Sequence, residues 1–339
     1  MKNPEIESIS DAIYEQRKLV RIHAMRRTLW VLPLALAPIA HAATTRRYVT
    51  RERERLLSML VDGTDIADPG SWLAESCDRV LELIAAEGPI DTRSIGNQLP
   101  ELRHRIELAQ GKRYATTTSA LSRVLLQMGF EGRVVRGKPA GTWVSSQYRW
   151  ESSEGFSGVV EKLDPAKART ELVQAWLGRF GPGTERDIAW WAGLPLGMVR
   201  QALQEIGAVE VELETGSGWV APDDVESTED PGPSVALLPG LDPSTMGWKE
   251  RDWYLDSDHA ALLFDRNGNG GPTVWVDGRI VGGWAQDADG RLVHRVLEDV
   301  GADTLTEIEE QAGCLESVWG DVRFSVRFPA PLQRELLAR

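Results

Sequence analysis

The clearest indication of the fold comes from residues 181–220, GPGTERDIAWWAGLPLGMVRQALQEIGAVEVELETGSGWV. Thr184, with the acidic residues Glu185 and Asp187 in the turn after it, predicts the start of a capped helix. Gly193 then favours a turn, and Pro195 favours the start of a second helix. Two short strands follow, at 209–213 and 218–220. Two helices joined by a turn and followed by a hairpin are typical of a winged helix.

A similar unit precedes this one in the chain. GPIDTRSI at 88–95 matches GPGTERDI at 181–188 in Gly, Pro, Arg and Ile, and GTWV at 141–144 matches SGWV at 217–220 in Trp and Val. Two matches in the same order indicate an internal repeat. The pattern around them predicts helices at 72–86, 92–98 and 115–128 and strands at 132–136 and 142–146.

The chain outside these units extends the same organisation. The sequence predicts an α+β fold of tandem winged-helix units (helix-turn-helix plus β-wing) with a β-rich C-terminal region. We expect a partial N-terminal winged-helix-like unit at 1–70, with a hairpin at 19–31. A second winged helix is expected at 71–150, a third at 160–225 and the β-rich region at 234–339. One of the strands expected in that region is Ala260–Asp265.

Composition and charge narrow the function. The chain has 339 residues, 42% of them hydrophobic, which excludes a disordered protein. Only two cysteines occur, far apart, which excludes a disulfide scaffold and favours the cytoplasm. The net charge is −13, but residues 1–150 carry +5 and residues 151–339 carry −18. This balance argues against indiscriminate polyanion binding and still allows a nucleic-acid surface in the first half.

Three other kinds of site are not expected. The apolar run Leu29–Ala43 contains two prolines and is too short to span a membrane. Residues 265–270 fit the first half of a calcium loop, but Val276 stands where that loop needs a glutamate. The five histidines are scattered, and no phosphate-binding or dinucleotide motif occurs. We therefore expect no metal and no cofactor.

Basic residues mark a candidate interface. The window 101–150 holds nine basic and three acidic residues, with hydroxyl and amide side chains between them. Lysine and arginine neutralise phosphates, and hydroxyls and amides add directional hydrogen bonds. Together with two arginines of the hairpin, they give the residues from which we expect DNA contacts: Arg26, Arg27, Lys112, Arg113, Arg123, Arg136, Lys138, Gln147 and Arg149.

Several longer stretches resemble one family. They are LVRIHAMRRTLWVLP (19–33), RGKPAGTWVSSQYRW (136–150), WAGLPLGMVRQAL (191–203), GWVAPDD (218–224), LLPGLDPSTMGWKERDWYL (237–255) and LFDRNGNGGPTVWVDGRIVGGWAQ (263–286). They resemble the winged-helix DNA-binding proteins of the AlkZ-like DNA glycosylase family. The resemblance implies a basic channel for duplex DNA and the excision of alkylated or crosslinked bases.

The chain departs from the family pattern in the motif that the family uses for catalysis. The family carries a Gln-x-Gln or Gln-x-Asp motif upstream of a hairpin of the type LVRxxAMRGTLHLVP. Neither motif occurs before Leu19, and Arg27 and Trp30 replace the Gly and His of that hairpin. We expect either that the natural start lies upstream or that the chain binds DNA without cleaving a glycosidic bond. The catalytic residues remain unassigned, and Glu15, Gln16 and Gln147 are candidates by residue type alone.

Two other functions fit the same residues. One is a non-enzymatic DNA-binding regulator, which would prefer a particular undamaged sequence. The other is a protein whose winged helices make only protein contacts, which the acidic second half favours. The expected partner is duplex DNA, alkylated or crosslinked, bound by a monomer that has no membrane contact.

Overall fold

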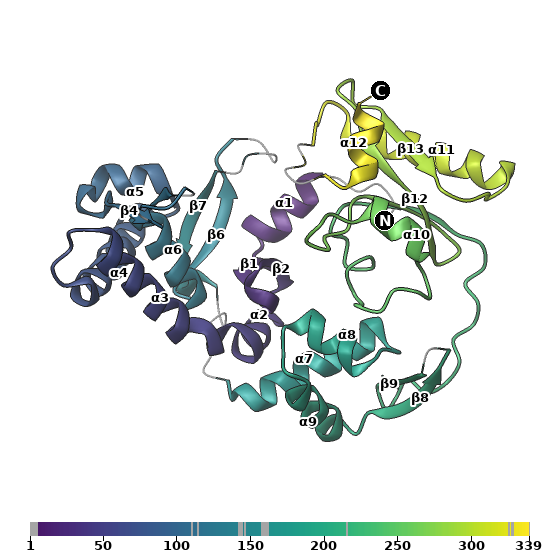
Figure 1. The fold of residues 1–339 in the computed structure, drawn as a ribbon, viewed down its shortest axis with the longest axis horizontal. Helices are drawn as coiled ribbons and strands as arrows, with labels where there is room; N and C mark the ends of the chain where they lie inside the picture. The colour runs from purple at the N-terminus through teal and green to yellow at the C-terminus, as the bar shows by residue number, and fades with distance from the viewer. Residues whose placement is uncertain are drawn as a thin grey trace. The chain divides into compact units, whose positions relative to one another are not determined.

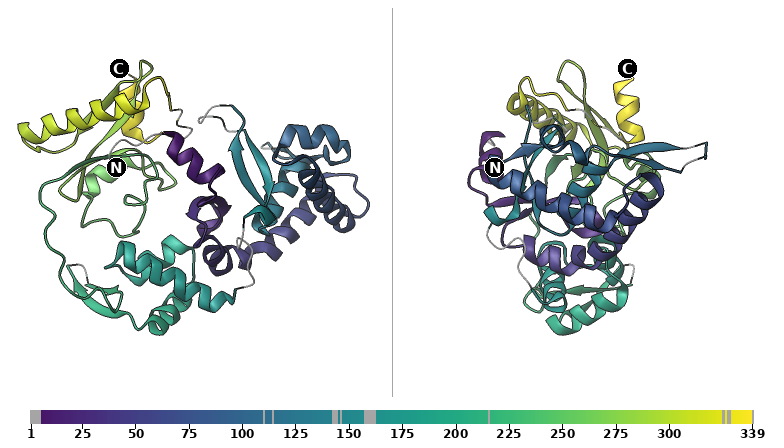
Figure 2. Two further views of the ribbon diagram at one scale, coloured as in Figure 1. Left: turned by 180° about the vertical axis from the view of Figure 1, so that it is seen from behind. Right: turned by 90° about the vertical axis from the view of Figure 1, so that its left-hand side faces the viewer.

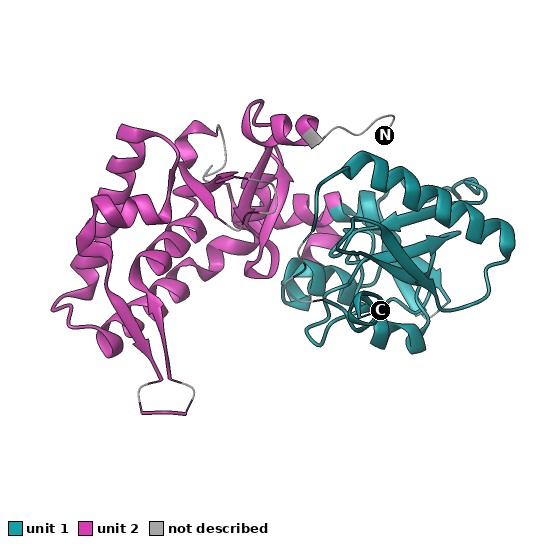
Figure 3. Ribbon diagram, turned by 90° about the horizontal axis from the view of Figure 1, so that it is seen from above, with its two compact units in different colours: residues 1–5, 176–200, 206–339 teal, residues 6–175, 201–205 magenta. Residues whose placement is uncertain are grey.

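A computed structural model describes residues 6–109, 111–113, 115–141, 145, 147–156, 163–214, 216–324, 326 and 329–338. These residues form two compact units, which Figure 3 shows in different colours. Unit 2 holds residues 6–175 and 201–205, and unit 1 holds residues 176–200 and 206–339. The chain as a whole mixes helices and strands, as the sequence predicts.

Unit 2 begins with a short helix and the predicted hairpin. The elements are α1 (Ile6–Tyr14), β1 (Leu19–His23), β2 (Leu29–Pro33), α2 (Ala37–Ala40) and α3 (Val49–Gly63). Strands β1 and β2 pair antiparallel, which confirms the hairpin. The apolar run Leu29–Ala43 is divided between β2, a turn at 34–36, α2 and the first residues of a π-helical segment, His41–Thr45. No helix in the described part of the chain has the length and apolar character needed to cross a membrane.

The rest of unit 2 is a helical cluster with a small sheet (Figure 1). Its elements are α4 (Pro69–Glu87), β3 (Ile90–Asp91), α5 (Thr92–Gln98), β4 (Arg105–Leu108), β5 (Thr116–Ser119), α6 (Ala120–Phe130), β6 (Val134–Pro139) and β7 (Tyr148–Ser152). The sheet order is β3-β7-β6, and all pairs are antiparallel. Strands β6 and β7 form a ribbon that extends from the helices (Figure 2).

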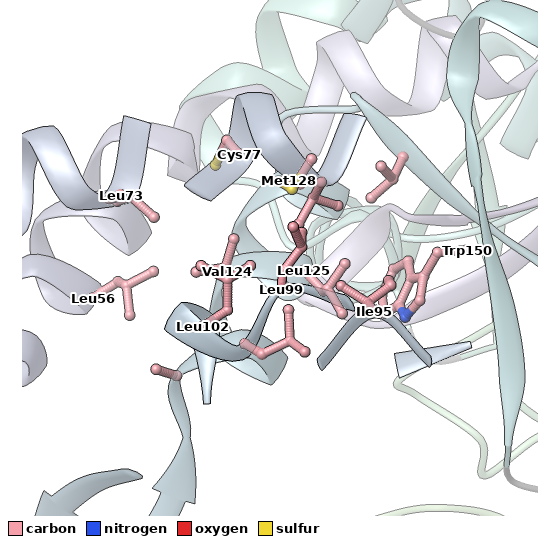
Figure 4. Close-up of a cluster of buried hydrophobic side chains, with 14 of the residues drawn as sticks. Leu56, Leu73, Cys77, Ile95, Leu99, Leu102, Val124, Leu125, Met128 and Trp150 are labelled. Atoms are coloured by element: carbon pink, nitrogen blue, oxygen red, sulfur yellow. The ribbon is translucent and has the colours of Figure 1, made fainter. Parts of the chain in front are cut away.

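One hydrophobic core holds these elements together. Side chains of α3 to α6 meet Trp150 of β7 in a single buried cluster, shown in Figure 4. Four of these side chains are fully buried: Ile95 of α5 and Val124, Leu125 and Met128 of α6. Such close packing fixes how α5, α6 and β7 lie against one another, and these elements frame the site described below.

The structure corrects two predictions in this unit. The helix expected at 115–128 begins only at Ala120, because residues 116–119 pair with β4 and Ser119 caps the helix. The strand expected at 142–146 is wrong at residue 145, and the partner of β6 is β7 at 148–152. Residues 142–144 and 146 of that prediction lie outside the described residues.

Unit 1 contains most of residues 181–220, the stretch that predicts a winged helix. The elements here are α7 (Pro165–Phe180) and α9 (Leu196–Ile206), which contribute to both units, and α8 (Glu185–Ala192), β8 (Val209–Leu213) and β9 (Gly216–Val220). Thr184 caps α8 as predicted, because its Oγ1 accepts the N–H of Asp187 at 3.1 Å. Asp187 is buried, and its carboxylate also accepts the backbone N–H groups of Lys249 and Glu250, each at 2.8 Å. One carboxylate thus joins the helix cap to a distant loop.

The C-terminal region is β-rich, as predicted. Its elements are β10 (Val235–Leu238), α10 (Ser257–Leu263), β11 (Thr273–Val276), β12 (Arg279–Gln286), β13 (Leu292–Val296), α11 (Ala302–Trp319) and α12 (Pro331–Leu337). The sheet order is β10-β11-β12-β13. Neighbours Ile280 and Val281 of β12 enter separate cores, because successive side chains of a strand point to opposite faces. Helix α11 covers one face, and α10 and α12 cover the other (Figure 1).

The strand expected at Ala260–Asp265 is wrong. Residues 257–263 form α10, because the Asp256 carboxylate accepts the N–H of Asp258 at 2.8 Å and caps a helical turn. Leu263 alone is buried in that helix. A short apolar run of this length cannot be assigned to helix or strand by periodicity, and the cap decides it.

Candidate nucleic-acid interface

A groove of about 700 Å³ lies on unit 2. It is bounded by the first turns of α5 and α6, the base of the β4–β5 hairpin and the start of β7. Most of its lining residues are polar and carry hydroxyl, amide or guanidinium groups. The lining residues are Asp91, Thr92, Arg93, Gly96, Asn97, Arg103, His104, Arg105, Ser119, Leu121, Ser122, Gln147 and Tyr148.

Both helices at the groove have side-chain caps at their N-termini. The Asp91 carboxylate accepts the N–H groups of Arg93 at 2.9 Å and Ser94 at 3.1 Å, and the Ser94 hydroxyl at 2.7 Å. The hydrogen bond from the Ser94 hydroxyl contributes most to lowering the pKa of Asp91, and the hydrogen bonds from the backbone N–H groups lower it further. Ser119 caps α6 by accepting the N–H of Ser122 at 3.3 Å. The start of an α-helix such as α6 carries partial positive charge, which favours an anion there.

Three arginines add full positive charges to the groove. Arg93, Arg103 and Arg105 are exposed, and none has an ion-pair partner in the part of the chain that the structure describes. Arg103 donates to Asn97 Oδ1, and Arg105 donates to Thr117 Oγ1 at 2.7 Å. Neutral partners orient the guanidinium groups without cancelling their charge. Arginine held in this way is well suited to the oxygens of a phosphate.

Sequence reasoning missed these three arginines. The signal for Arg93 was available, because it lies two residues after the helix cap Asp91. Arg103 and Arg105 lie just before and at the start of β4, a strand that the sequence pattern does not predict. Only the hairpin and the packed helices bring the three side chains to one groove.

Four of the predicted contact residues lie on the elements that form the groove. Gln147 is exposed and lines it directly. Arg149 is exposed on β7, opposite Asp91 in the strand register. Lys112 and Arg113 are exposed in the loop that joins β4 to β5. These positions are compatible with the expected DNA contacts.

Three other predicted residues lie away from the groove. Arg27 pairs with Glu52 at 2.7 Å, and Lys138 pairs with Glu15 at 3.8 Å. Arg26 is half-buried in the turn of the β1–β2 hairpin. The carboxylates reduce the charge that Arg27 and Lys138 can offer to a phosphate.

The last two predicted residues are packed cations. Arg136 lies with its guanidinium over the ring of Tyr148, 4.1 Å from the ring centre. Burial lowers the pKa of Arg136, and the charge of Arg21 lowers it further. Arg123 is half-buried on α6, and its Nε has no hydrogen-bond partner among the described residues. Cations in such surroundings stabilise packing as much as they attract phosphate.

The residues named as candidates for catalysis are not brought together. Gln16 donates to Asp11 and Glu15 pairs with Lys138, so both are engaged near the end of α1. Only Gln147 reaches the groove. Its carboxamide offers a donor and an acceptor, which suits hydrogen bonds to bases or to a water molecule. The arrangement as described is suited to binding a polyanion.

Fold and groove thus define a mixed α+β protein with a cationic, hydrogen-bonding surface suited to nucleic acid. The chain belongs to the AlkZ-like DNA glycosylase family: the family described as DNA glycosylase AlkZ-like matches residues 1–318. This match confirms the family resemblance seen in the sequence.

Individual proteins agree with this assignment. An interstrand DNA cross-link repair glycosylase of Streptomyces sahachiroi is 24% identical over 287 residues, which cover 77% of this chain and 74% of the relative. The solved structure of the Streptomyces sahachiroi DNA glycosylase AlkZ has a TM-score of 0.65 at 21% identity. That similarity covers 96% of this chain and 85% of the solved one, so the two share a fold.

Proposed function

We propose that the protein binds duplex DNA that carries alkylated or crosslinked bases, through the groove of unit 2. The observation that carries the proposal is the set of three groove arginines beside the N-terminus of α6, none of which pairs with a carboxylate of the described residues. Family membership supplies the kind of polyanion. The relative described as an interstrand cross-link repair glycosylase supports a crosslinked or alkylated base as the lesion.

We further propose that the fold contains tandem winged-helix units. In the winged-helix unit proposed at 71–150, α4, α5 and α6 are followed by β6 and β7, with β3 as a third strand. In the winged-helix unit proposed at 160–225, α7, α8 and α9 are followed by β8 and β9. An isolated β-bridge between Gly183 and Trp219 takes the position that β3 has in the preceding winged-helix unit. The repeated order supports boundaries at 71–150 and 160–225, between an N-terminal part at 1–70 and the region at 234–339.

DNA binding is tested by fluorescence anisotropy on a labelled duplex at several salt concentrations. Each phosphate neutralised adds a slope of about −0.9 to log K against log salt, so three contacts predict a slope of about −3. Arg93→Glu should weaken binding about tenfold, and it suits the first turn of α5, where acidic residues are favoured. The matched control is Arg266→Glu, an exposed arginine of unit 1. An affinity that does not change with salt contradicts the proposal.

The nature of the lesion is tested on matched duplexes. We expect tighter binding to an alkylated or crosslinked duplex than to the same undamaged sequence. Excision of a base leaves an abasic site, which alkali converts to a strand break that a gel resolves. Preference for one undamaged sequence over every damaged duplex would instead identify a regulator.

A further inference from the structure

A second pocket, of about 470 Å³, lies within unit 1. It is formed at the edge of the sheet by the ends of β10 and β12, the end of α11 and residues of α12. Its volume falls within the range of sites that hold small organic molecules. Its walls are mostly apolar, unlike those of the groove in unit 2.

Three aromatic rings make one wall of this pocket. Trp284 and Trp319 stack with ring centres 5.6 Å apart and planes 29° apart. Phe324 meets Trp319 edge-on at 4.9 Å. Trp284 Nε1 donates to the carbonyl of Leu238 at 3.0 Å, which holds its ring in place. A fixed aromatic wall favours a flat ligand, because parallel or edge-on ring contacts need no rearrangement.

The rim of the pocket exposes apolar side chains. Leu241 is 59% exposed, Phe324 45% and Leu337 49%, and all three line the pocket. Apolar side chains that gather around one hollow indicate a binding site more strongly than scattered ones do. The rim therefore adds apolar surface that a ligand would cover.

A buried amide supplies a polar contact. Gln333 lines the pocket and is 4% exposed. Its Oε1 accepts the N–H of Ala330 at 3.1 Å. Within the described ranges, no hydrogen bond engages its Nε2. A carboxamide nitrogen in the wall of a pocket supplies a hydrogen-bond donor for an acceptor on a ligand.

Much of this wall lies outside the family match. The match ends at residue 318, and Trp319, Phe324 and Gln333 come after it. The ligand of the pocket is therefore not implied by what the family does to DNA.

We propose that this pocket binds a planar aromatic small molecule that carries a carbonyl acceptor. The aromatic ring of the ligand packs against the wall formed by Trp284, Trp319 and Phe324, and the carbonyl accepts a hydrogen bond from Gln333 Nε2. Binding requires neither DNA nor the groove of unit 2.

The test uses quinolin-2-one, a flat bicyclic lactam, as the probe. Isothermal titration calorimetry on the full chain without DNA should give a Kd on the order of 100 µM. The fully saturated decahydroquinolin-2-one keeps the carbonyl and loses the flat ring, and it should bind at least about tenfold more weakly. No binding up to the solubility limit, or equal binding of both lactams, overturns the proposal.

Variants locate the binding site. Trp319→Leu removes part of the aromatic wall and should weaken quinolin-2-one about tenfold. Gln333→Glu keeps the acceptor for Ala330 and removes the Nε2 donor, so it should also weaken binding. Trp253→Leu is the matched control, because Trp253 is 55% exposed and does not line the pocket.

Circular dichroism confirms that each variant is folded. An unchanged Kd in Trp319→Leu contradicts the assignment. DNA affinity, measured separately, should be the same in Trp319→Leu as in the wild type, so failure of either proposal leaves the other testable.

Discussion

At the scale of single residues, His23 is buried in unit 2 beside an aromatic ring. It is 6% exposed, and its ring centre lies 4.8 Å from that of Phe130. Burial, with a further contribution from the charge of Arg136, lowers the pKa of His23 to about 4. The pKa of His41 is lowered as well, chiefly by burial. Both rings are therefore neutral in the folded protein at neutral pH.

His23 predicts a loss of stability in acid. The unfolded chain binds a proton near pH 6.5 and the folded one only near pH 4, so stability falls as the pH falls through this window. The expected loss from His23 between pH 7 and pH 5 is about 2 kcal/mol. Urea unfolding at the two pH values measures it. His23→Phe keeps the aromatic contact and should lose about 2 kcal/mol less over the same range; an equal loss would show that His23 does not titrate in this way.

At the scale of elements, the turn of the β1–β2 hairpin is unusual. Arg26 and Arg27 have φ angles of 55° and 60°, in the left-handed region that favours glycine. The family hairpin has Gly where this chain has Arg27. The structure shows what the arginine adds, because it pairs with Glu52 at 2.7 Å on an exposed surface.

Two substitutions separate the backbone from the ion pair. Arg27→Ala loses the pair and keeps a β-carbon in the left-handed region, whereas Arg27→Gly loses the pair and relieves the backbone. We expect the glycine variant to be more stable than the alanine variant by about 1 kcal/mol. Thermal or urea unfolding measures the difference. Equal stabilities would mean that the turn adapts to the side chain.

The hairpin β4–β5 shows where element prediction fails. The helix predicted over 115–128 includes the threonines at 116–118, which by propensity favour a strand. Local propensity was the better guide there, because the strand is completed by its partner β4. In contrast, α8 was predicted with its cap, because Thr184 and Asp187 act within a single turn.

At the scale of the whole molecule, positive charge is concentrated in the first half. Residues 1–150 carry +5 and residues 151–339 carry −18. The contrast extends to the hairpins, because the strand β6 carries Arg136 and Lys138, whereas Glu210 and Glu212 lie on β8. A polyanion is expected to avoid β8–β9 even though both hairpins follow helices in the same order.

Hydrogen exchange tests this charge partition. On addition of duplex DNA, amides at the start of α6 and in the β4–β5 hairpin should exchange more slowly. Amides of β8–β9 should keep their rates, because the acidic side chains repel phosphates. Protection of β8–β9 with no change at α6 would contradict the proposed interface.

The sequence by itself determined the α+β class, the Thr184 cap of α8, the hairpin at the N-terminal end and the family, because these depend on local patterns and on long matching stretches. Tertiary structure decided which cations face a common groove. Arg93, Arg103 and Arg105 are brought together only by the packing of α5, α6 and the β4–β5 hairpin. Glu52 and Glu15 reach Arg27 and Lys138 across 25 and 123 positions of the chain. Pairing over such separations depends on how the chain folds back on itself, which spacing along the sequence does not encode.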